Sequence, residues 1–159
     1  MRRFLLAFSA FFLCSSAASA QIAVESLGDY GHWFSQSFVK SGKPVCYMYS
    51  VPDKDISSFL VVSETKGDNS VGTVNLEVKS GIKSDNKVIV KVDNKHTFTL
   101  VPVGNKAWSD KEDDKIIEAF KKGALAKVMY LTPDGNEVTE IYSLSGFTKA
   151  KAAIDKACK

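Results

Sequence analysis

Residues 87–100, KVIVKVDNKHTFTL, decide the fold class. Residues 87–92 are rich in Val and Ile and residues 96–100 in Thr and Phe, a composition typical of β-strands. The three residues between them are Asp93, Asn94 and Lys95, and Asp and Asn tolerate the left-handed backbone that a tight turn needs. The stretch therefore predicts an antiparallel β-hairpin.

The same kind of segment recurs on both sides of this hairpin. Residues 45–51, 57–63 and 71–78 are short runs rich in Val, Phe, Tyr and Thr, separated by clusters of Gly, Asp, Asn and Lys. A second hairpin is predicted between residues 126–131 and 137–142, because Pro-Asp-Gly-Asn between them favours a turn. We expect a mainly β, antiparallel domain.

Two helices are predicted within this β-rich chain. The first covers about residues 110–122: acidic residues stand at its start, Ile and Phe form one apolar face, and Gly123 ends it. The acidic run at its start lacks the central Gly of a calcium loop, so we interpret it as a capped helix start. The second covers residues 148–158, where Ala and Ile recur at the spacing of one helix face.

Cysteines favour one disulfide. Cys46 lies in an alternating strand-like run, and Cys158 lies on the apolar face of the terminal helix. The third cysteine of the chain, Cys14, lies within the expected signal peptide, so the exported chain keeps two. An even number of cysteines in an exported chain indicates pairing, so we expect a Cys46–Cys158 bridge. The competing interpretation is a reactive thiol pair, which is disfavoured because neither cysteine stands in a C-x-x-C motif or beside a histidine.

The N-terminus predicts export. Arg2 and Arg3 precede an apolar run, residues 4–13, and Ala18-Ser19-Ala20 is a small-x-small cleavage site. We expect residues 1–20 to be a signal peptide and residues 21–159 a single domain. The alternative is an uncleaved anchor, although the apolar run is shorter than the roughly 20 residues that span a bilayer.

The charged residues argue against nucleic-acid binding. Both arginines of the chain lie in the expected signal peptide, which leaves nineteen lysines against eighteen acidic residues. Recognition of phosphates and base edges favours arginine on a concentrated basic face, and this composition offers neither. With 45% hydrophobic residues, the chain has an ordinary composition for one folded domain.

The histidines limit the possible catalytic chemistry. His32 and His96 are the two in the chain, and neither lies beside a nucleophile motif such as G-x-S-x-G. Two histidines and two cysteines scattered in this way do not have the spacing of zinc ligands. No phosphate-binding loop or dinucleotide motif is present in the sequence. We expect no enzyme activity, no cofactor and no metal.

Six aromatic residues are candidates for the core or for a recognition surface. Because a small sandwich has few other large residues to fill it, we expect them in the core, although Tyr and Trp at alternate strand positions can also face a partner. They are Trp33, Phe34, Tyr47, Tyr49, Phe59 and Phe98.

Several motifs together resemble one known family. They are KPVCY at 43–47, FTL at 98–100, AW at 107–108, AFKKG at 119–123, and YSLSGFT at 142–148 before the terminal Cys158. Their order and spacing are similar to those of the invasion-associated locus B family of bacterial exported proteins, over nearly all of residues 21–159.

This resemblance implies an immunoglobulin-like antiparallel β-sandwich with two added helices, in the periplasm or cell envelope of Gram-negative bacteria. It also implies a link to invasion of host cells, particularly erythrocytes, with no established enzymatic activity or ligand. The chain departs from the family pattern at residues 129–140, where similar proteins carry Arg-Gly-Thr and this chain reads Leu-Thr-Pro-Asp-Gly at 131–135. We expect this hairpin tip, residues 131–137, to be exposed and to take part in partner binding.

The expected function is therefore a non-enzymatic one in the periplasm or envelope, or outside the cell after secretion. The protein would bind an unidentified envelope or host-surface partner during invasion and virulence, with no integral membrane anchor after signal cleavage. Two alternatives stay open: a housekeeping role in envelope integrity, and a periplasmic enzyme that uses His32 or His96.

Overall fold

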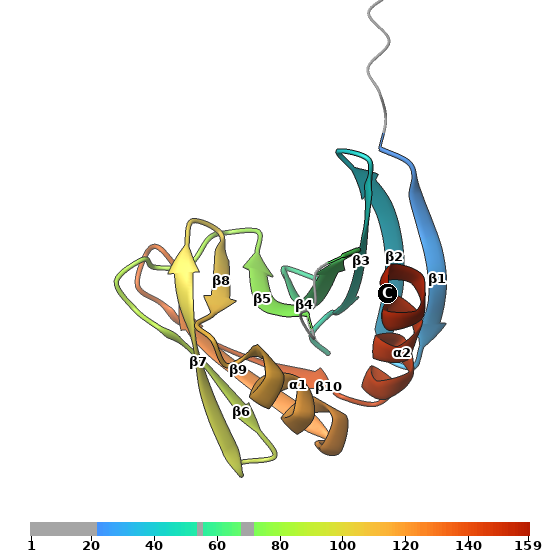
Figure 1. Ribbon diagram of the computed structural model, residues 1–159. Helices are drawn as coiled ribbons and strands as arrows, with labels where there is room; N and C mark the ends of the chain where they lie inside the picture. The colour runs from blue at the N-terminus through green and yellow to red at the C-terminus, as the bar shows by residue number, and fades with distance from the viewer. Residues whose placement is uncertain (1–21, 54–55, 68–71) are drawn as a thin grey trace, which may run out of the picture.

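The computed structural model describes residues 22–53, 56–67 and 72–159 (Figure 1). The expected signal peptide, residues 1–20, lies outside the described residues. In chain order the elements are β1 Val24–Tyr30, β2 Trp33–Lys40, β3 Lys43–Ser50, β4 Ser58–Thr65, β5 Thr73–Val78, β6 Val88–Val92, β7 His96–Val103, β8 Lys106–Ser109, α1 Asp113–Lys122, β9 Leu125–Leu131, β10 Glu137–Ser143 and α2 Phe147–Cys158.

The described strands form one sheet in the order β1-β2-β3-β4-β5-β8-β7-β6-β9-β10. Every neighbouring pair is antiparallel. The sheet curls so strongly that β10, at one end of the ladder, returns to the connection between β3 and β4 (Figure 1). There Asp53 N donates to Ile141 O at 3.2 Å, and the Ser58 hydroxyl donates to Glu140 at 2.6 Å.

The predicted fold class is confirmed: the protein is mainly β and antiparallel, with two helices. The structure adds that the two layers of the expected sandwich are parts of one rolled sheet, joined by a continuous hydrogen-bonded ladder. Both predicted hairpins are also confirmed. Asp93 and Asn94 have φ values of 47° and 56° in the β6–β7 turn, and Leu131 pairs with Glu137 in the β9–β10 hairpin.

The helices follow the sequence prediction with one correction. α2 spans Phe147–Cys158, one residue more than expected, whereas α1 begins at Asp113 and not at residue 110. Lys111 has a φ of 63°, which a helix cannot include, so the chain turns there before the helix starts. Asp113 makes no helix cap; its carboxylate accepts the Val74 N–H at 2.6 Å and so ties α1 to β5.

The core lies between the inner face of the rolled sheet and the two helices. α2 packs across β1, β2 and β3, and Phe147 meets Trp33 edge to face at 4.9 Å between ring centroids. On β3 the buried side chains are Cys46, Met48 and Ser50, at alternate positions. Because strand side chains alternate between faces, this spacing also fixes which residues of β3 face outwards.

Candidate functional site: an aromatic groove on the outer face of the sheet

A row of side chains crosses five strands on the face opposite the core. The register pairs Phe34 with Tyr49, Tyr49 with Val61, Val61 with Asn75, and Asn75 with Trp108. Residues that pair directly across antiparallel strands project to the same face. The row therefore brings three aromatic rings and one amide, far apart in the sequence, onto one continuous surface.

This surface is hollowed into a groove of about 540 Å³, within the range of small-molecule and cofactor sites. We call it the aromatic groove. Strands β2 and β3 supply one side, β5 and β8 the other, and β4 lies between them (Figure 1). Its lining residues are Gln36, Phe38, Lys40, Val45, Tyr47, Tyr49, Phe59, Val61, Ser63, Asn75, Glu77, Lys106 and Trp108.

The groove corrects one sequence prediction. Phe34, Tyr47, Tyr49 and Phe59 were expected in the core, but each is only half-buried and lies on the outer face. Of the six aromatics, only Trp33 and Phe98 are core residues, with 0% and 8% of their surfaces exposed. The physical reason is strand alternation: a strand that turns Cys46 and Met48 inwards must turn the residues between them outwards.

Tyr49 is the centre of the aromatic cluster. Its ring stacks on Phe34 at 5.3 Å and on Tyr47 at 6.3 Å, with interplanar angles of 28° and 23°. Phe59 meets it edge to face at 5.8 Å, and Phe38 does the same to Tyr47 at 5.8 Å. Each ring is therefore held by a neighbour while part of its residue's surface remains accessible, which makes an ordered aromatic surface.

The polar side chains of the groove are mostly paired with one another. Lys106 Nζ lies 2.9 Å from Glu77 Oε2 and 5.9 Å from the centre of the Trp108 ring. The Tyr47 hydroxyl donates to Gln36 Oε1. Burial and, to a smaller extent, the neighbouring Tyr49 raise the pKa of Tyr47 above its ordinary value, so this hydroxyl stays protonated. The groove thus presents fixed donors and acceptors with little net charge.

Asn75 is the exception among these polar groups. Only 3% of its surface is exposed, and its side-chain oxygen Oδ1 has no hydrogen-bond partner in the part of the chain that the structure describes. Leaving a buried acceptor unpaired costs about 1 to 3 kcal/mol. Because Asn75 lines the aromatic groove, its buried side-chain amide lies next to any molecule that enters the groove.

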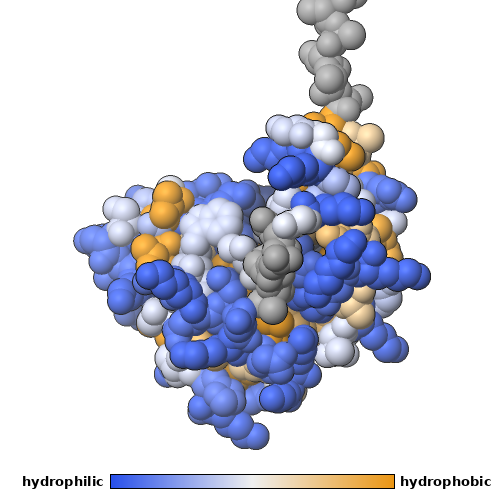
Figure 2. Space-filling view, viewed as in Figure 1, coloured by the Kyte–Doolittle hydropathy of each residue, from blue (hydrophilic) through white to orange (hydrophobic). Residues whose placement is uncertain are grey.

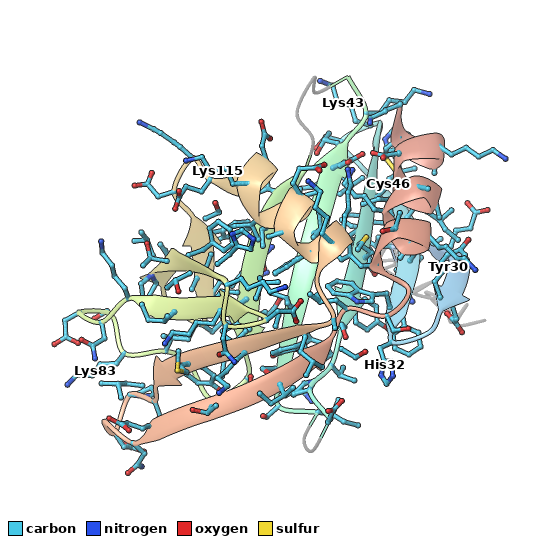
Figure 3. All side chains as sticks on the ribbon, turned by 90° about the horizontal axis from the view of Figure 1, so that it is seen from below. Tyr30, His32, Lys43, Cys46, Lys83 and Lys115 are labelled. Atoms are coloured by element: carbon cyan, nitrogen blue, oxygen red, sulfur yellow. A yellow bond between two sulfur atoms is a disulfide. The ribbon has the colours of Figure 1, made fainter. Side chains whose placement is uncertain are left out.

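The candidate catalytic residues lie elsewhere. His32 is exposed at the turn between β1 and β2 and points away from the sheet (Figure 3). His96 is exposed at the start of β7, where its ring stacks on Phe98 at 6.4 Å. Neither histidine lines the aromatic groove. The structure therefore does not bring the two histidines together with the aromatic cluster.

A second polar cluster closes the roll of the sheet. Glu140, 8% exposed, accepts hydrogen bonds from the hydroxyls of Ser58, Tyr130 and Tyr142 at 2.6, 3.0 and 2.9 Å. Burial, followed by the charge of Glu140, raises the pKa of Tyr142 far above its ordinary value, so that Tyr142 remains a donor. With three donors on one carboxylate, the cluster is satisfied internally and links β4, β9 and β10.

The disulfide supports the groove from behind. Cys46 and Cys158 are bonded, with their Cα atoms 5.9 Å apart, and Cys46 lies beside α2 (Figure 3). Nearby on α2, the buried Lys151 contacts Glu64 of β4 and lies 2.6 Å from Asp155. α2 is thereby fixed to the inner side of β3 and β4, the two strands that carry Tyr47, Tyr49 and Phe59 on their outer side.

Comparison with known proteins shows which family has this architecture. The model of the family described as invasion associated locus B (IalB) protein matches residues 33–155, from the first residue of β2 into α2. The chain belongs to the invasion-associated locus B family. The match contains every strand that lines the aromatic groove, whereas β1 and Cys158 lie outside it.

A solved IalB structure confirms the fold. The crystal structure of invasion associated protein b from Bartonella henselae is 24% identical in sequence, covers 83% of this chain and 98% of its own, and superposes with a TM-score of 0.57. A search of the curated proteins found no match. In this IalB family member, none of the described helices is long and apolar enough to cross a membrane.

Proposed function

We propose that this IalB family protein is an exported envelope protein that acts by binding a partner, without catalysis, in the interaction of the bacterium with a host cell. The aromatic groove is its binding site. The proposal rests on one observation above all: a buried amide oxygen, Asn75 Oδ1, without a partner among the described residues, on the β5 side of a groove lined by half-buried aromatic rings.

Location in the periplasm or envelope is part of the same proposal. It is supported by the signal-like residues 1–20 and by the disulfide, which needs an oxidising compartment. The link to invasion is supported by family membership and by the name of the Bartonella henselae protein. The face seen in Figure 2 is mostly hydrophilic, with hydrophobic side chains in small separate groups, as expected for a protein that is not embedded in lipid.

A complementation experiment tests this function. A deletion strain of the native bacterium would receive the wild-type gene, a groove variant with Tyr49→Ala and Trp108→Ala, or a variant with His32→Ala and His96→Ala. Host-cell invasion and envelope permeability to detergent would be measured, together with the amount of folded protein. The groove variant should lose invasion while the envelope barrier stays intact.

The histidine variant is the matched control, because both histidines are exposed and lie outside the groove. It should invade like wild type, since no general base is needed for binding. Loss of invasion in this variant with normal folding would favour the alternative that the protein is a periplasmic enzyme that uses His32 or His96. A groove variant that weakens the barrier and leaves invasion unchanged would favour the housekeeping role.

A further inference from the structure

We propose that the ligand of the aromatic groove is an uncharged glycan: a short stretch of oligosaccharide that stacks its sugar rings on Tyr49 and Trp108 and donates a hydroxyl to Asn75 Oδ1. This inference rests on the proposed function, because it assigns a ligand class to the same site. It follows from three properties of the groove: flat rings, a buried unpaired acceptor, and paired charges.

The rings set the shape of the ligand. The Phe34 and Tyr47 rings each lie within 30° of parallel to the Tyr49 ring, so the three rings form one ordered row across β2 and β3. Aromatic faces carry negative potential and attract polarised C–H groups, which a sugar ring presents from one of its faces. Trp108 stands on the opposite side of the groove, on β8. The rings can therefore contact a chain of flat units from both sides.

The hydrogen-bonding groups set its chemistry. Asn75 Oδ1 requires a donor, and its neighbours in the groove, Gln36, Ser63 and Glu77, offer further acceptors. A hydroxyl group can donate to one of these atoms and accept from another. A hydrocarbon chain would leave Asn75 Oδ1 unpaired and would also remove water from the Glu77–Lys106 pair at no gain.

The charges of the groove disfavour a strongly ionic ligand. Lys106 is engaged by Glu77 at 2.9 Å, and the remaining cation of the lining, Lys40, is exposed at the end of β2. Among the described residues, an anionic polymer would meet Lys40, the Glu77–Lys106 pair and Lys79, which lies 5.6 Å from the centre of the Phe59 ring, whereas phosphate-binding surfaces gather several unpaired lysines or arginines around one site. An uncharged, hydroxyl-rich chain matches this balance.

Titration of the purified exported protein tests the proposal. The probes would be maltotetraose, cellotetraose, chitotetraose and galactotetraose, with tryptophan fluorescence as the measurement. Trp108 is half-exposed in the groove, whereas Trp33 is fully buried and its indole N–H donates a hydrogen bond to Ser143 O. A change in tryptophan emission therefore reports on Trp108. At least one tetrasaccharide should give a saturable change. Replacing Trp108 with Leu should abolish the signal, and calorimetry should then show binding weakened at least tenfold.

Asn75→Val supplies the decisive variant. It removes the unpaired oxygen and keeps a strand-forming residue, so it should weaken glycan binding about tenfold without lowering the melting temperature. Asn86→Ala, at an exposed position away from the groove, is the control and should bind like wild type. Glycan binding that survives Asn75→Val unchanged would overturn the assignment of Asn75.

The outcomes separate this inference from the proposed function. Suppose that no tetrasaccharide binds, but an extended peptide changes Trp108 emission and its binding is weakened by Asn75→Val. The ligand class would then be wrong, and the groove would remain a binding site. If a tetrasaccharide binds and the groove variant still supports invasion, the groove is a glycan-binding site, and the proposal that it acts in invasion is wrong. If neither class of probe binds, the glycan proposal is overturned.

Discussion

The two faces of β3 differ in how completely their polar and reactive groups are paired. On the inner face, Cys46 is bonded to Cys158, and the neighbouring buried ion pair joins Lys151 to Glu64. On the outer face, the aromatic groove contains half-exposed rings and one buried oxygen without a partner among the described residues. In the proposed function, stability and recognition therefore belong to opposite sides of the same strands: the inner face is closed, and the outer face would be completed by a ligand.

The largest effect should come from breaking the ion pair of the inner face. Lys151 and Glu64 are 3% and 6% exposed, so Lys151→Met leaves a buried carboxylate without its cation. Removing one partner of a buried pair costs about 3 to 5 kcal/mol, and we expect a loss of that size in the free energy of unfolding, measured with urea. Lys149→Met, on an exposed position of the same helix, is the control and should change stability by less than about 0.5 kcal/mol.

The pH dependence of this loss has a defined sign. Burial already raises the pKa of Glu64 above its ordinary value, against the opposing hydrogen bond from Lys151. A carboxyl group whose pKa is higher in the folded state binds its proton more tightly there, so acidification stabilises the folded form through that group. The deficit of Lys151→Met should therefore shrink as the pH falls through the folded pKa of Glu64. A deficit independent of pH would mean that packing, not charge, is lost.

The disulfide should give the next effect. It closes a loop of 112 residues, and removing a native bridge costs about 2 to 5 kcal/mol. We expect Cys158→Ser to lower the free energy of unfolding by this amount under oxidising conditions. Wild type and variant should become nearly equal under a reductant, which separates the bridge from the packing of the side chain. Two free thiols in freshly purified protein, detected by mass spectrometry, would contradict the bridge.

The sequence predicts those parts of the two faces whose sequence signals lie close to the elements that they define. The two hairpins and α2 were predicted correctly because turn residues and helix periodicity lie next to the elements they define. β1 and β2 were not predicted as strands. In β1 the register shifts between Ser26 and Gly28, where Gly28 has a φ of 125°, and this bulge disrupts the alternation that marks a strand.

The groove was predictable only in part. The expected bridge from Cys46 to the apolar face of the terminal helix turns Cys46 inwards, so alternation implies that Tyr47 and Tyr49 face outwards. This signal is outweighed by the expectation that aromatic residues fill a small core. Asn75 carried no such signal. Its position next to Val61 and Trp108 follows from strand pairing over tens of residues, and its lack of a partner is a property of the packed sheet.

A smaller effect, of opposite sign, should appear on the outer face. Asn75→Val removes a buried acceptor that makes no hydrogen bond to the described residues, and Val is a better strand former than Asn. We expect the free energy of unfolding to rise by about 1 kcal/mol, measured with urea in the absence of ligand. A gain in stability combined with a loss of binding is typical of a residue kept for function. A loss of 1 kcal/mol or more would instead show that the Asn75 side chain stabilises the sheet.

The hairpin tip at residues 131–137 should give the smallest effect on stability and decides between two binding surfaces. Pro133, Asp134 and Gly135 are exposed, and the turn is closed mainly by hydrogen bonds between Thr132 and Asn136. Grafting the Arg-Gly-Thr version of this turn should therefore change the free energy of unfolding by no more than about 0.5 kcal/mol.

The tip was the binding surface expected from sequence, but none of its residues lines the aromatic groove. If the groove is the site, the graft should bind the same partner with unchanged affinity, in a pull-down from envelope and host-membrane extracts followed by calorimetry. Altered binding with unchanged stability would return recognition to the tip, and an unfolded graft would show that the β9–β10 turn is needed to close the roll of the sheet.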